Sequence, residues 1–294
     1  MNQVICFGEV LWDIFPDVQI PGGAPMNVCI VLKKLGIGSK MISKIGKDEL
    51  GQKLKNYLET ENSLSDFLQE TEKYPTGIVQ VKSNEQGKNE YTIVQPVAWD
   101  FIENNEEVKE AVKKSKAFVF GTLACRSQQT KSTLLELLKI APFKIFDVNF
   151  RTPFYTQELV EELFHWTDFV KMNDEELQII SSWYQWENKN EKEAMEKVQQ
   201  KFNIPQIVVT KGKHGADYLE RNNFFTSQGY SVKVVDTVGS GDSFLAGFLK
   251  KYFEKEHPEK CLQFACATGS LVATYKGANP PITENQILNF IKSN

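Results

Sequence analysis

Short apolar runs alternate with amphipathic runs along most of this 294-residue chain. The apolar runs are typical of buried strands, and they lie at residues 4–8, 40–45, 117–121, 144–148, 168–171 and 206–210. Runs with helical spacing lie between them, at residues 27–35, 50–59, 130–140, 157–164, 174–182 and 191–202. This alternation predicts an α/β fold in which helices cover both faces of a mostly parallel sheet, formed by residues 1–294 as a single domain. In such folds, ligands bind at the carboxyl ends of the strands.

Two segments, residues 11–21 and 77–95, do not follow this alternation. Both are extended in pattern, and the second is interrupted by Asn-Glu-Gln-Gly at 84–87. They predict a small β lid over the strand ends. The charged runs at 103–116 and 187–201 are expected to be solvated faces of helices.

The charge and composition exclude several classes of function. Hydrophobic residues make up 41% and charged residues 24% of the chain, as in ordinary globular proteins. A net charge of −4 gives no attraction for nucleic acid or an anionic membrane. No apolar run approaches the roughly 18 residues of a membrane helix. Five cysteines without a Cys-x-x-Cys pair, and three scattered histidines, predict reduced thiols, no zinc site and a cytoplasmic protein.

The segment 236–249 carries the clearest chemistry. A strand-like run at 230–235 leads into the turn Gly239-Ser240-Gly241, and an apolar helical run follows Asp242. Small residues leave backbone N–H groups uncovered, and a helix N-terminus attracts anions, so this turn predicts a site for a phosphoryl group. Asp242 is either a general base that accepts a proton from an attacking hydroxyl or an ordinary helix-capping aspartate. The chain has neither a Walker A motif nor a dinucleotide fingerprint, in which Phe244 would have to be glycine.

Two segments together resemble the signatures of the PfkB (ribokinase-like) carbohydrate kinases. Residues 236–242, Asp-Thr-Val-Gly-Ser-Gly-Asp, are similar to the C-terminal signature, and residues 21–28, Pro-Gly-Gly-Ala-Pro-Met-Asn-Val, are similar to the N-terminal one. Further family-like pieces follow in order at 75–77, 147–151, 171–176, 210–215 and 276–280. The resemblance covers residues 8–281. It implies a three-layer α/β/α fold with a β lid, and ATP-dependent phosphorylation of a sugar primary hydroxyl with Mg²⁺.

The resemblance also implies a sugar site formed by Asp13, Gly22, Gly23, Asn27 and Arg151. A carboxylate accepts hydrogen bonds from two vicinal hydroxyls, an amide both donates and accepts, and glycines allow close approach of the backbone. The alternatives are structural: Asp13 as a turn residue, the glycines as a plain turn, and Asn27 as a first-turn helix residue.

Trp99 has two interpretations as well. Its ring either stacks on the apolar face of the sugar or lies in the core beneath the lid.

For the nucleotide, the resemblance implies that Asp242 is the base and that the N–H groups of Gly239, Ser240 and Gly241 stabilise the transferring phosphoryl group. Residues expected near the ATP are Asn149, Lys171, Asn173, Thr210, Gly212 and Gly215. Glu176 is expected to orient hydrated Mg²⁺, in a position that also suits the first turn of a helix. His214 is expected not to be catalytic.

A monovalent cation is a further possibility that the resemblance raises. Asp236 would be a ligand, but Pro281 stands where some relatives have a hydroxyl ligand. A requirement for K⁺ therefore stays open.

The acceptor sugar is indicated by residues 8–13 and 91–100, which look most like those of bacterial fructokinases. A phosphorylated substrate would need an extra basic cluster, and the nearest candidates, Lys33 and Lys34, lie inside a predicted helix. A neutral hexose, D-fructose, is therefore favoured. Ribose, a 2-keto-3-deoxy sugar acid and a nucleoside remain alternatives, as does a non-catalytic sugar-sensing protein. The resemblance further allows a homodimer that pairs through the lid edges.

Overall fold

A computed structural model describes residues 3–61, 64–83 and 89–294. Its main sheet has the order β13-β12-β11-β10-β9-β8-β1-β4-β5. From β11 to β5 all neighbours are parallel, and β12 and β13 are antiparallel additions at one edge. In sheet order, the strands are β13 (Asn223–Ser227), β12 (Ala216–Glu220), β11 (Gln206–Thr210), β10 (Phe169–Asn173), β9 (Lys144–Asp147), β8 (Ala117–Gly121), β1 (Val4–Phe7), β4 (Ser39–Gly46) and β5 (Phe67–Thr71). The mostly parallel sheet predicted from the sequence is confirmed.

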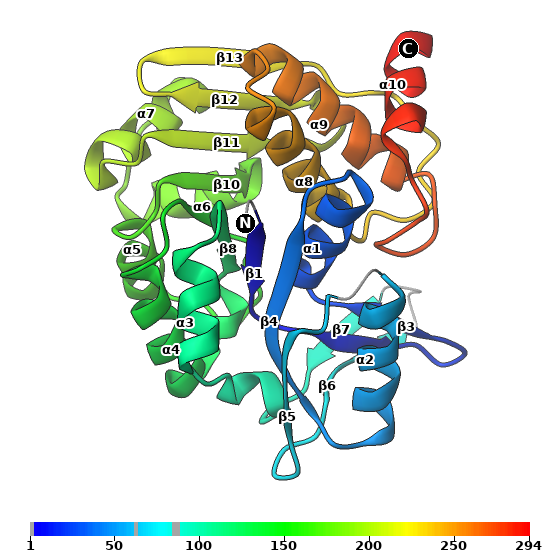
Figure 1. Cartoon of the computed structure of the whole chain (residues 1–294). Coiled ribbons are helices and arrows are strands. Elements are labelled where there is room, and N and C mark those ends of the chain that lie inside the picture. The colour runs from blue at the N-terminus through cyan, green and yellow to red at the C-terminus, as the bar shows by residue number, and fades with distance from the viewer. Residues whose placement is uncertain (1–2, 62–63, 84–88) are drawn as a thin grey trace.

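Helices cover both faces of this sheet (Figure 1). One layer contains α1 (Ala24–Lys34), α8 (Ser240–Phe253), α9 (Pro258–Val272) and α10 (Glu284–Ser293). The other contains α3 (Glu106–Lys113), α4 (Gln128–Leu138), α5 (Gln157–Phe164), α6 (Asp174–Trp183) and α7 (Glu191–Phe202). Val4 and Cys6 of β1 pack into the first layer, whereas Ile5 and Phe7 pack into the second. Burial on both faces explains why the central strands are continuous apolar runs.

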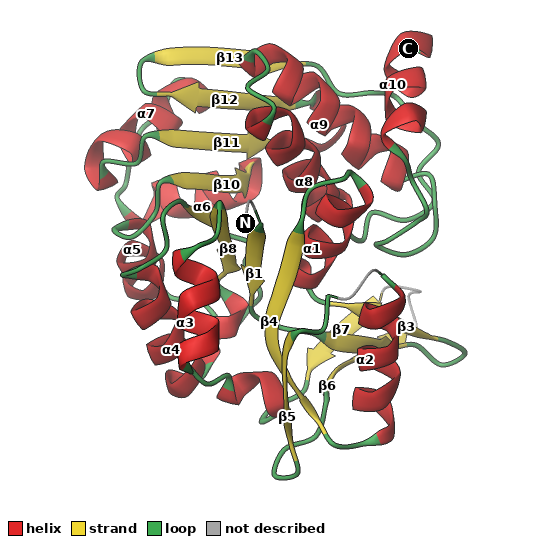
Figure 2. Ribbon diagram, viewed as in Figure 1, coloured by secondary structure: helices red, strands yellow, loops and turns green. Residues whose placement is uncertain are grey.

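A second, smaller sheet lies beside α2 (Glu49–Thr60), as Figure 2 shows. Its order is β3 (Gln19–Gly22), β2 (Leu11–Ile14), β6 (Gly77–Ser83) and β7 (Asn89–Ile93). The two segments expected to be extended therefore do form one sheet; residues 84–87 lie outside the described residues. Residues 8–10 join β1 directly to β2, so this sheet stands at the carboxyl edge of the main sheet. The indole N–H of Trp12 donates to the Leu50 carbonyl oxygen at 3.0 Å and ties the sheet to α2.

The prediction of a strand at residues 230–235 is wrong. This segment is irregular, and Val234 and Val235 are 56% and 59% exposed. The Val235 N–H donates to the Ala273 carbonyl oxygen at the end of α9, not to a neighbouring strand. Strands β5, β12 and β13 were not anticipated, because they are partly polar and their pairing depends on strands distant in the sequence.

The cysteines are consistent with the reduced thiols expected from the sequence, because all five are buried and free. In the part of the chain that the structure describes, no helix combines the length and apolarity needed to cross a bilayer.

Candidate active site

The turn before α8 exposes backbone donors. Gly239 caps the helix in a left-handed conformation (φ 76°, ψ −4°), and a Cβ at this position would lie 2.6 Å from Ala278 Cα. The Ser240 N–H donates to the Thr237 carbonyl oxygen at 3.2 Å, so it is already engaged in the turn. Among the described residues, no acceptor bonds the N–H groups of Gly239, Gly241 and Asp242. The donors left for an anion are therefore two of the three expected from the sequence, those of Gly239 and Gly241, together with that of Asp242.

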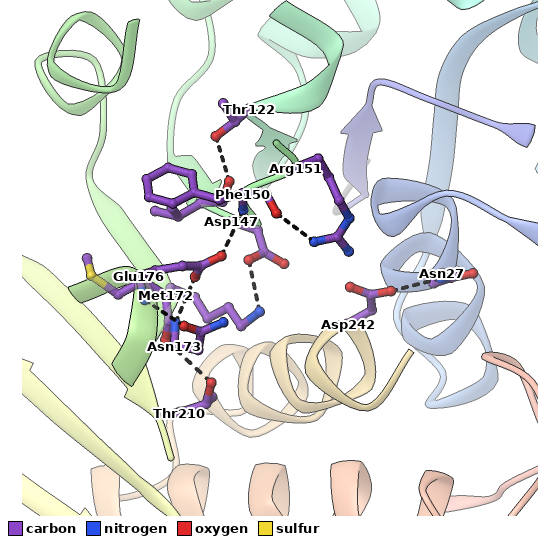
Figure 3. A network of polar contacts seen from close by, with 12 residues as sticks. Asn27, Thr122, Asp147, Phe150, Arg151, Met172, Asn173, Glu176, Thr210 and Asp242 are labelled. Atoms are coloured by element: carbon purple, nitrogen blue, oxygen red, sulfur yellow. Dashed lines mark hydrogen bonds and ion pairs between the residues drawn. The ribbon is translucent and has the colours of Figure 1, made fainter. Parts of the chain in front are cut away.

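Asp242 lies in the first turn of α8 and is only 9% exposed. Its Oδ2 accepts a hydrogen bond from Asn27 Nδ2 at 2.8 Å, and the two side chains point toward one another in Figure 3. Burial, followed by the charge of Asp147, raises the pKa of Asp242 to about 6, against the opposing effects of Lys171, Asn27 and Arg151. A carboxylate with this pKa is ionised at neutral pH and is still basic enough to accept a proton.

Lys171 and Asp147 form a buried ion pair beneath this turn. They face each other in register on β10 and β9, with Nζ and Oδ1 2.9 Å apart. Burial lowers the pKa of Lys171, but the carboxylates of Asp147, Glu176 and Asp242 outweigh it and raise the pKa. A Cβ on Gly241 would lie 3.1 Å from Lys171 Nζ, so the ammonium is close to the turn. The cation is thus placed where a phosphate would approach the start of α8.

Glu176 joins the start of α6 to the loop after β9. Its Oε2 accepts from the Asn173 N–H and its Oε1 from the Phe150 N–H, both at 2.8 Å, as Figure 3 shows. Asn173 Oδ1 in turn accepts from the Glu176 N–H at 2.7 Å, which completes a capping box. Burial raises the pKa of Glu176, and Lys171 opposes this rise. The structural and the functional interpretation of this motif are therefore compatible.

The oxygen donors here fit a hydrated Mg²⁺. Beside the fixed carboxylate of Glu176, Asp147 Oδ2 is buried and has no hydrogen-bond partner. Oxygen ligands, with water completing the shell, are what Mg²⁺ prefers. No group of three His, Cys, Asp or Glu side chains that could enclose a metal ion occurs among the described residues.

The loop after β11 contains two glycines with positive φ, Gly212 (52°) and Gly215 (93°). A Cβ on Gly215 would lie 1.9 Å from the Ser227 carbonyl oxygen, so packing against β13 requires glycine here. Thr210 ends β11, and its hydroxyl donates to the Met172 carbonyl oxygen at 3.4 Å. His214 is exposed in the short helix Gly212–His214.

Asn149 lies on the loop that follows β9, where it has a positive φ of 42°. It adjoins Phe150 and Arg151, and so it lies on the loop that Glu176 holds in place.

The predicted sugar residues gather beside Asp242. Asp13 lies on β2, and burial raises its pKa to about 6, with Arg151 opposing and Asp236 adding to the rise. A Cβ on Gly22 would lie 2.8 Å from Asp13 Oδ2, and one on Gly23 would lie 2.4 Å from the Glu9 carbonyl oxygen. Gly23, with φ 123° and backbone atoms this close, is therefore required at the start of α1, whereas a Cβ on Gly22 would displace the carboxylate of Asp13. The exposed Arg151 donates to the Phe150 carbonyl oxygen and extends toward Asp242 in Figure 3.

Trp99 does not belong to this group. Its ring is fully buried in the second-layer core, and the Arg126 guanidinium lies 3.8 Å from the ring centroid. A ring without exposed surface cannot stack on a sugar, so the core interpretation is the right one and the substrate-binding prediction is wrong for this conformation.

Asp236 lies in the turn before α8, where it links two loops. Its Oδ1 accepts from the Val238 N–H and its Oδ2 from the Gly277 N–H, both at 3.0 Å. The carboxylate thus holds the loop after α9 against the turn before α8.

Three residues that the sequence analysis left without a role lie at this site. Asp147 pairs with Lys171, and Asn279 bonds Asn27. Glu9 is 4% exposed, its Oε2 has no partner, and burial raises its pKa to about 7. The signal for two of them was a polar residue at the carboxyl end of a buried strand. Glu9 lies two residues after β1, and Asp147 is the last residue of β9.

A cavity of about 410 Å³ lies elsewhere, lined by Lys116, Tyr252 and Cys261 among others. Its lining includes none of the residues that form the candidate active site.

The chain was compared with known proteins. The family model described as pfkB family carbohydrate kinase matches residues 2–285. The chain is 28% identical to a probable chloroplastic fructokinase-6 of Arabidopsis thaliana, covering 97% of this chain and 81% of the relative. It is 27% identical to fructokinase-2 of Solanum habrochaites, covering 98% and 96%.

Solved structures agree on the fold. A double mutant of the Vibrio cholerae O395 fructokinase, in a form bound to fructose, ADP and potassium, superimposes with a TM-score of 0.86 at 23% identity, over 99% of this chain and 98% of that one. The three-layer ribokinase-like architecture expected from the sequence is thereby confirmed. With the family model matching almost from end to end, the chain belongs to the pfkB family of carbohydrate kinases.

Proposed function

We propose that this kinase transfers the γ-phosphoryl group of ATP to the primary 6-hydroxyl of D-fructose. The observation that carries the proposal is the position of Asp242, a buried carboxylate with a pKa of about 6 in the same helical turn as two unbonded N–H groups. One element thus supplies a base for the hydroxyl and donors for the phosphoryl group.

In the proposed reaction, the Asp242 carboxylate accepts the hydroxyl proton as the sugar oxygen bonds to the γ-phosphorus. The bond between the γ-phosphorus and the bridging oxygen breaks, and ADP leaves with its electron pair. The N–H groups of Gly241 and Asp242, together with Lys171, stabilise negative charge on the transferring group. Asp242 later releases its proton to water.

Glu176 and Asp147 would hold a hydrated Mg²⁺, which when bound offsets the charge of the triphosphate. Asn149, Asn173, Thr210, Gly212 and Gly215 would line the nucleotide site around it. The small sheet built from β2, β3, β6 and β7 would act as the lid, excluding water from the sugar side.

Fructose is favoured as the acceptor because full-length relatives are named fructokinases. The local charges agree with a neutral sugar. Lys34 donates to the carbonyl oxygens of Asn279 and Pro280 and pairs with Glu61, so it is not free to bind a substrate phosphate. Asp13, Gly22, Gly23, Asn27 and Arg151 would contact the hydroxyls.

A monovalent cation beside Asp236 is part of the proposal, because a structural neighbour was solved with potassium. Both oxygens of Asp236 already accept backbone N–H groups, so the cation would complete an existing loop junction. Titration with KCl against choline chloride tests this.

We also propose a homodimer that forms through the small sheet. Strands β3 and β7 are the outer strands of that sheet as far as it is described, and unpaired edges favour pairing with a second copy. Light scattering coupled to gel filtration measures the mass.

The decisive experiment is a coupled ADP-release assay with Mg-ATP and a panel of acceptors: fructose, ribose, glucose, a 2-keto-3-deoxy sugar acid and adenosine. We expect the highest kcat/KM with fructose, and a loss of about 10²–10⁴-fold in kcat for Asp242→Asn. Preference for another acceptor would overturn the fructose assignment but leave the mechanism. Sugar binding without turnover on any acceptor would favour a sensor.

A further inference from the structure

The loop after α9 meets the active site through one side chain, that of Asn279. Asn279 Nδ2 donates to Asn27 Oδ1 at 2.8 Å, although the two residues are 252 positions apart in the sequence. The other end of the Asn27 amide, Nδ2, donates to Asp242 Oδ2 at 2.8 Å. Asn27 therefore lies between Asn279 and the proposed base.

The backbone around Asn279 is held at several points. The Gly277 N–H donates to Asp236, Ala278 packs against Gly239, and Lys34 Nζ donates to the Asn279 carbonyl oxygen at 2.9 Å. These contacts hold the backbone of the loop beside Asn27. The Asn279 Oδ1 is buried without a hydrogen-bond partner among the described residues, so at this site the amide bonds to Asn27 through its Nδ2.

The NH₂ end of an amide donates hydrogen bonds and the oxygen end accepts them, so the orientation of the Asn27 amide decides whether it can bond to Asp242. Asn27 can present either its NH₂ group or its oxygen to Asp242. The oxygen would meet a carboxylate that cannot donate, and two acceptors in contact repel. A donor on the far side of Asn27 favours the orientation in which the oxygen points away from Asp242.

We propose that Asn279 is a positioning residue for the reaction: by donating to Asn27 Oδ1, it fixes the amide orientation in which Asn27 donates to Asp242. The inference rests on the proposed role of Asp242 as the base. It makes the family-like segment 276–280 part of the machinery that sets the basicity of that carboxylate.

Other charged groups act on Asp242 as well. Asp147 raises its pKa, while Lys171 and Arg151 lower it. The charge of Asp242 in turn raises the pKa of Glu9. None of these groups is altered by a change at Asn279. A shift in the pH profile of the uncharged variant Asn279→Leu therefore reports on Asn27, whereas the new carboxylate of Asn279→Asp also acts on Asp242 directly.

The test uses the isosteric change Asn279→Asp, which replaces the donor with an acceptor, beside Asn279→Leu, which removes hydrogen bonding. Asn279→Gln keeps the donor, and Asn289→Asp on the exposed face of α10 makes the same charge change elsewhere. We expect kcat to fall about 10- to 100-fold in Asn279→Asp, less in Asn279→Leu and least in Asn279→Gln. The acidic limb of kcat/KM should move up by about half to one pH unit, because the bond from Asn27 lowers the pKa of Asp242.

A second measurement does not depend on turnover. In a ¹H–¹⁵N NMR spectrum, the Asn27 side-chain NH₂ signal, assigned by its loss in Asn27→Ser, should titrate with Asp242 in the wild type and lose this titration in Asn279→Asp. An unchanged NH₂ titration together with an unchanged acidic limb would overturn the proposal. So would an equal loss of activity at every pH with a lowered Tm, which is the result of a purely structural role. If Asp242→Asn keeps full activity, the proposed function fails first and the positioning role fails with it; if Asp242→Asn is inactive while Asn279→Asp matches the wild type, only the positioning role fails.

Discussion

Lys171 and Asp147 face each other on neighbouring parallel strands, with Nζ and Oδ1 2.9 Å apart and both side chains almost fully buried. The pair lies below the start of α8. Its charges act on Asp242 in opposite directions, since Asp147 raises the pKa of that carboxyl and Lys171 lowers it. The pair therefore bears on both the stability of the fold and the basicity of the site.

Replacing one partner tests this. Lys171→Met should lower the free energy of unfolding by about 3–5 kcal/mol, because it leaves the Asp147 charge buried and unpaired. It should also reduce kcat strongly. The matched control is Lys144→Met, which breaks the ion pair between Lys144 and Asp168 at the other end of β9. Nζ and Oδ2 of this pair are 3.4 Å apart, and the two side chains are 20% and 36% exposed. We therefore expect this change to lower the free energy of unfolding by only about 0–1 kcal/mol. Urea unfolding measures both, and equal losses would contradict the assignment.

Asp242 should limit stability at neutral pH. Its pKa in the folded protein, about 6, lies above its ordinary 3.8, so the ionised form opposes folding. This cost is absent below about pH 4 and fully present above about pH 6, where it reaches at most about 3 kcal/mol. Asp242→Asn should therefore be more stable than the wild type at pH 7.5, with the gap closing as the pH falls toward 4.5. Thermal unfolding measures the difference. If the gap in Tm between Asp242→Asn and the wild type stays the same from pH 7.5 to 4.5, ionisation of Asp242 does not oppose folding.

The activity of the wild type should also depend on Asp242. Because only the carboxylate can accept a proton, kcat/KM should fall as the pH drops through about 6, with a slope of one. Two other carboxyl groups at the site titrate in this range, because burial raises the pKa of Glu9 to about 7 and that of Asp13 to about 6. Repeating the profile with Glu9→Gln and with Asp13→Asn separates the three carboxyl groups. We expect the limb near 6 to remain in both variants, and its disappearance in either one would assign it to the residue replaced.

The left-handed turn before α8 can be tested against a glycine of the same conformation. Gly239→Ala combines the cost of a positive φ with a contact of 2.6 Å to Ala278, whereas Gly36 has φ 79° and open space around its Cα. Gly36→Ala should cost about 1 kcal/mol and leave kcat unchanged. Gly239→Ala should cost more and reduce kcat at least tenfold, because the N–H groups of the turn are displaced. Similar effects of both changes on kcat would mean that the contact with Ala278 does not matter.

Metal dependence should be carried by Glu176. Removing Mg²⁺ with EDTA should abolish turnover, and Glu176→Gln should raise the Mg²⁺ concentration needed for half-maximal activity about tenfold or more. Glu175, the neighbouring acid in the same helical turn, is exposed, so Glu175→Gln is the matched control. If the two variants need the same Mg²⁺ concentration, Glu176 acts only as a helix cap.

Much of this arrangement could be predicted from the sequence, because strand and helix periods and two signatures are local patterns. They indicated the sheet, the small second sheet and the place of Asp242. The pairing of Lys171 with Asp147 depends on strand register, which no local pattern contains. The burial of Trp99 was not predictable from a local pattern either, because it depends on Arg126 and Gly77, which lie in other segments of the chain. Residues 230–235 alternate like a strand, yet they bond to the end of α9, because tertiary contacts override local preference.

The separation of 215 positions between Asn27 and Asp242 has a consequence for biosynthesis. Every strand that the structure describes ends by Ser227, before the turn and helix that bring the base. A growing chain can therefore present every described strand before it has the proposed base or the proposed phosphoryl-binding turn, and before it has α8 and α9, which cover one face of the main sheet. Under the proposed mechanism, phosphoryl transfer becomes possible only when α8 emerges and docks against α1.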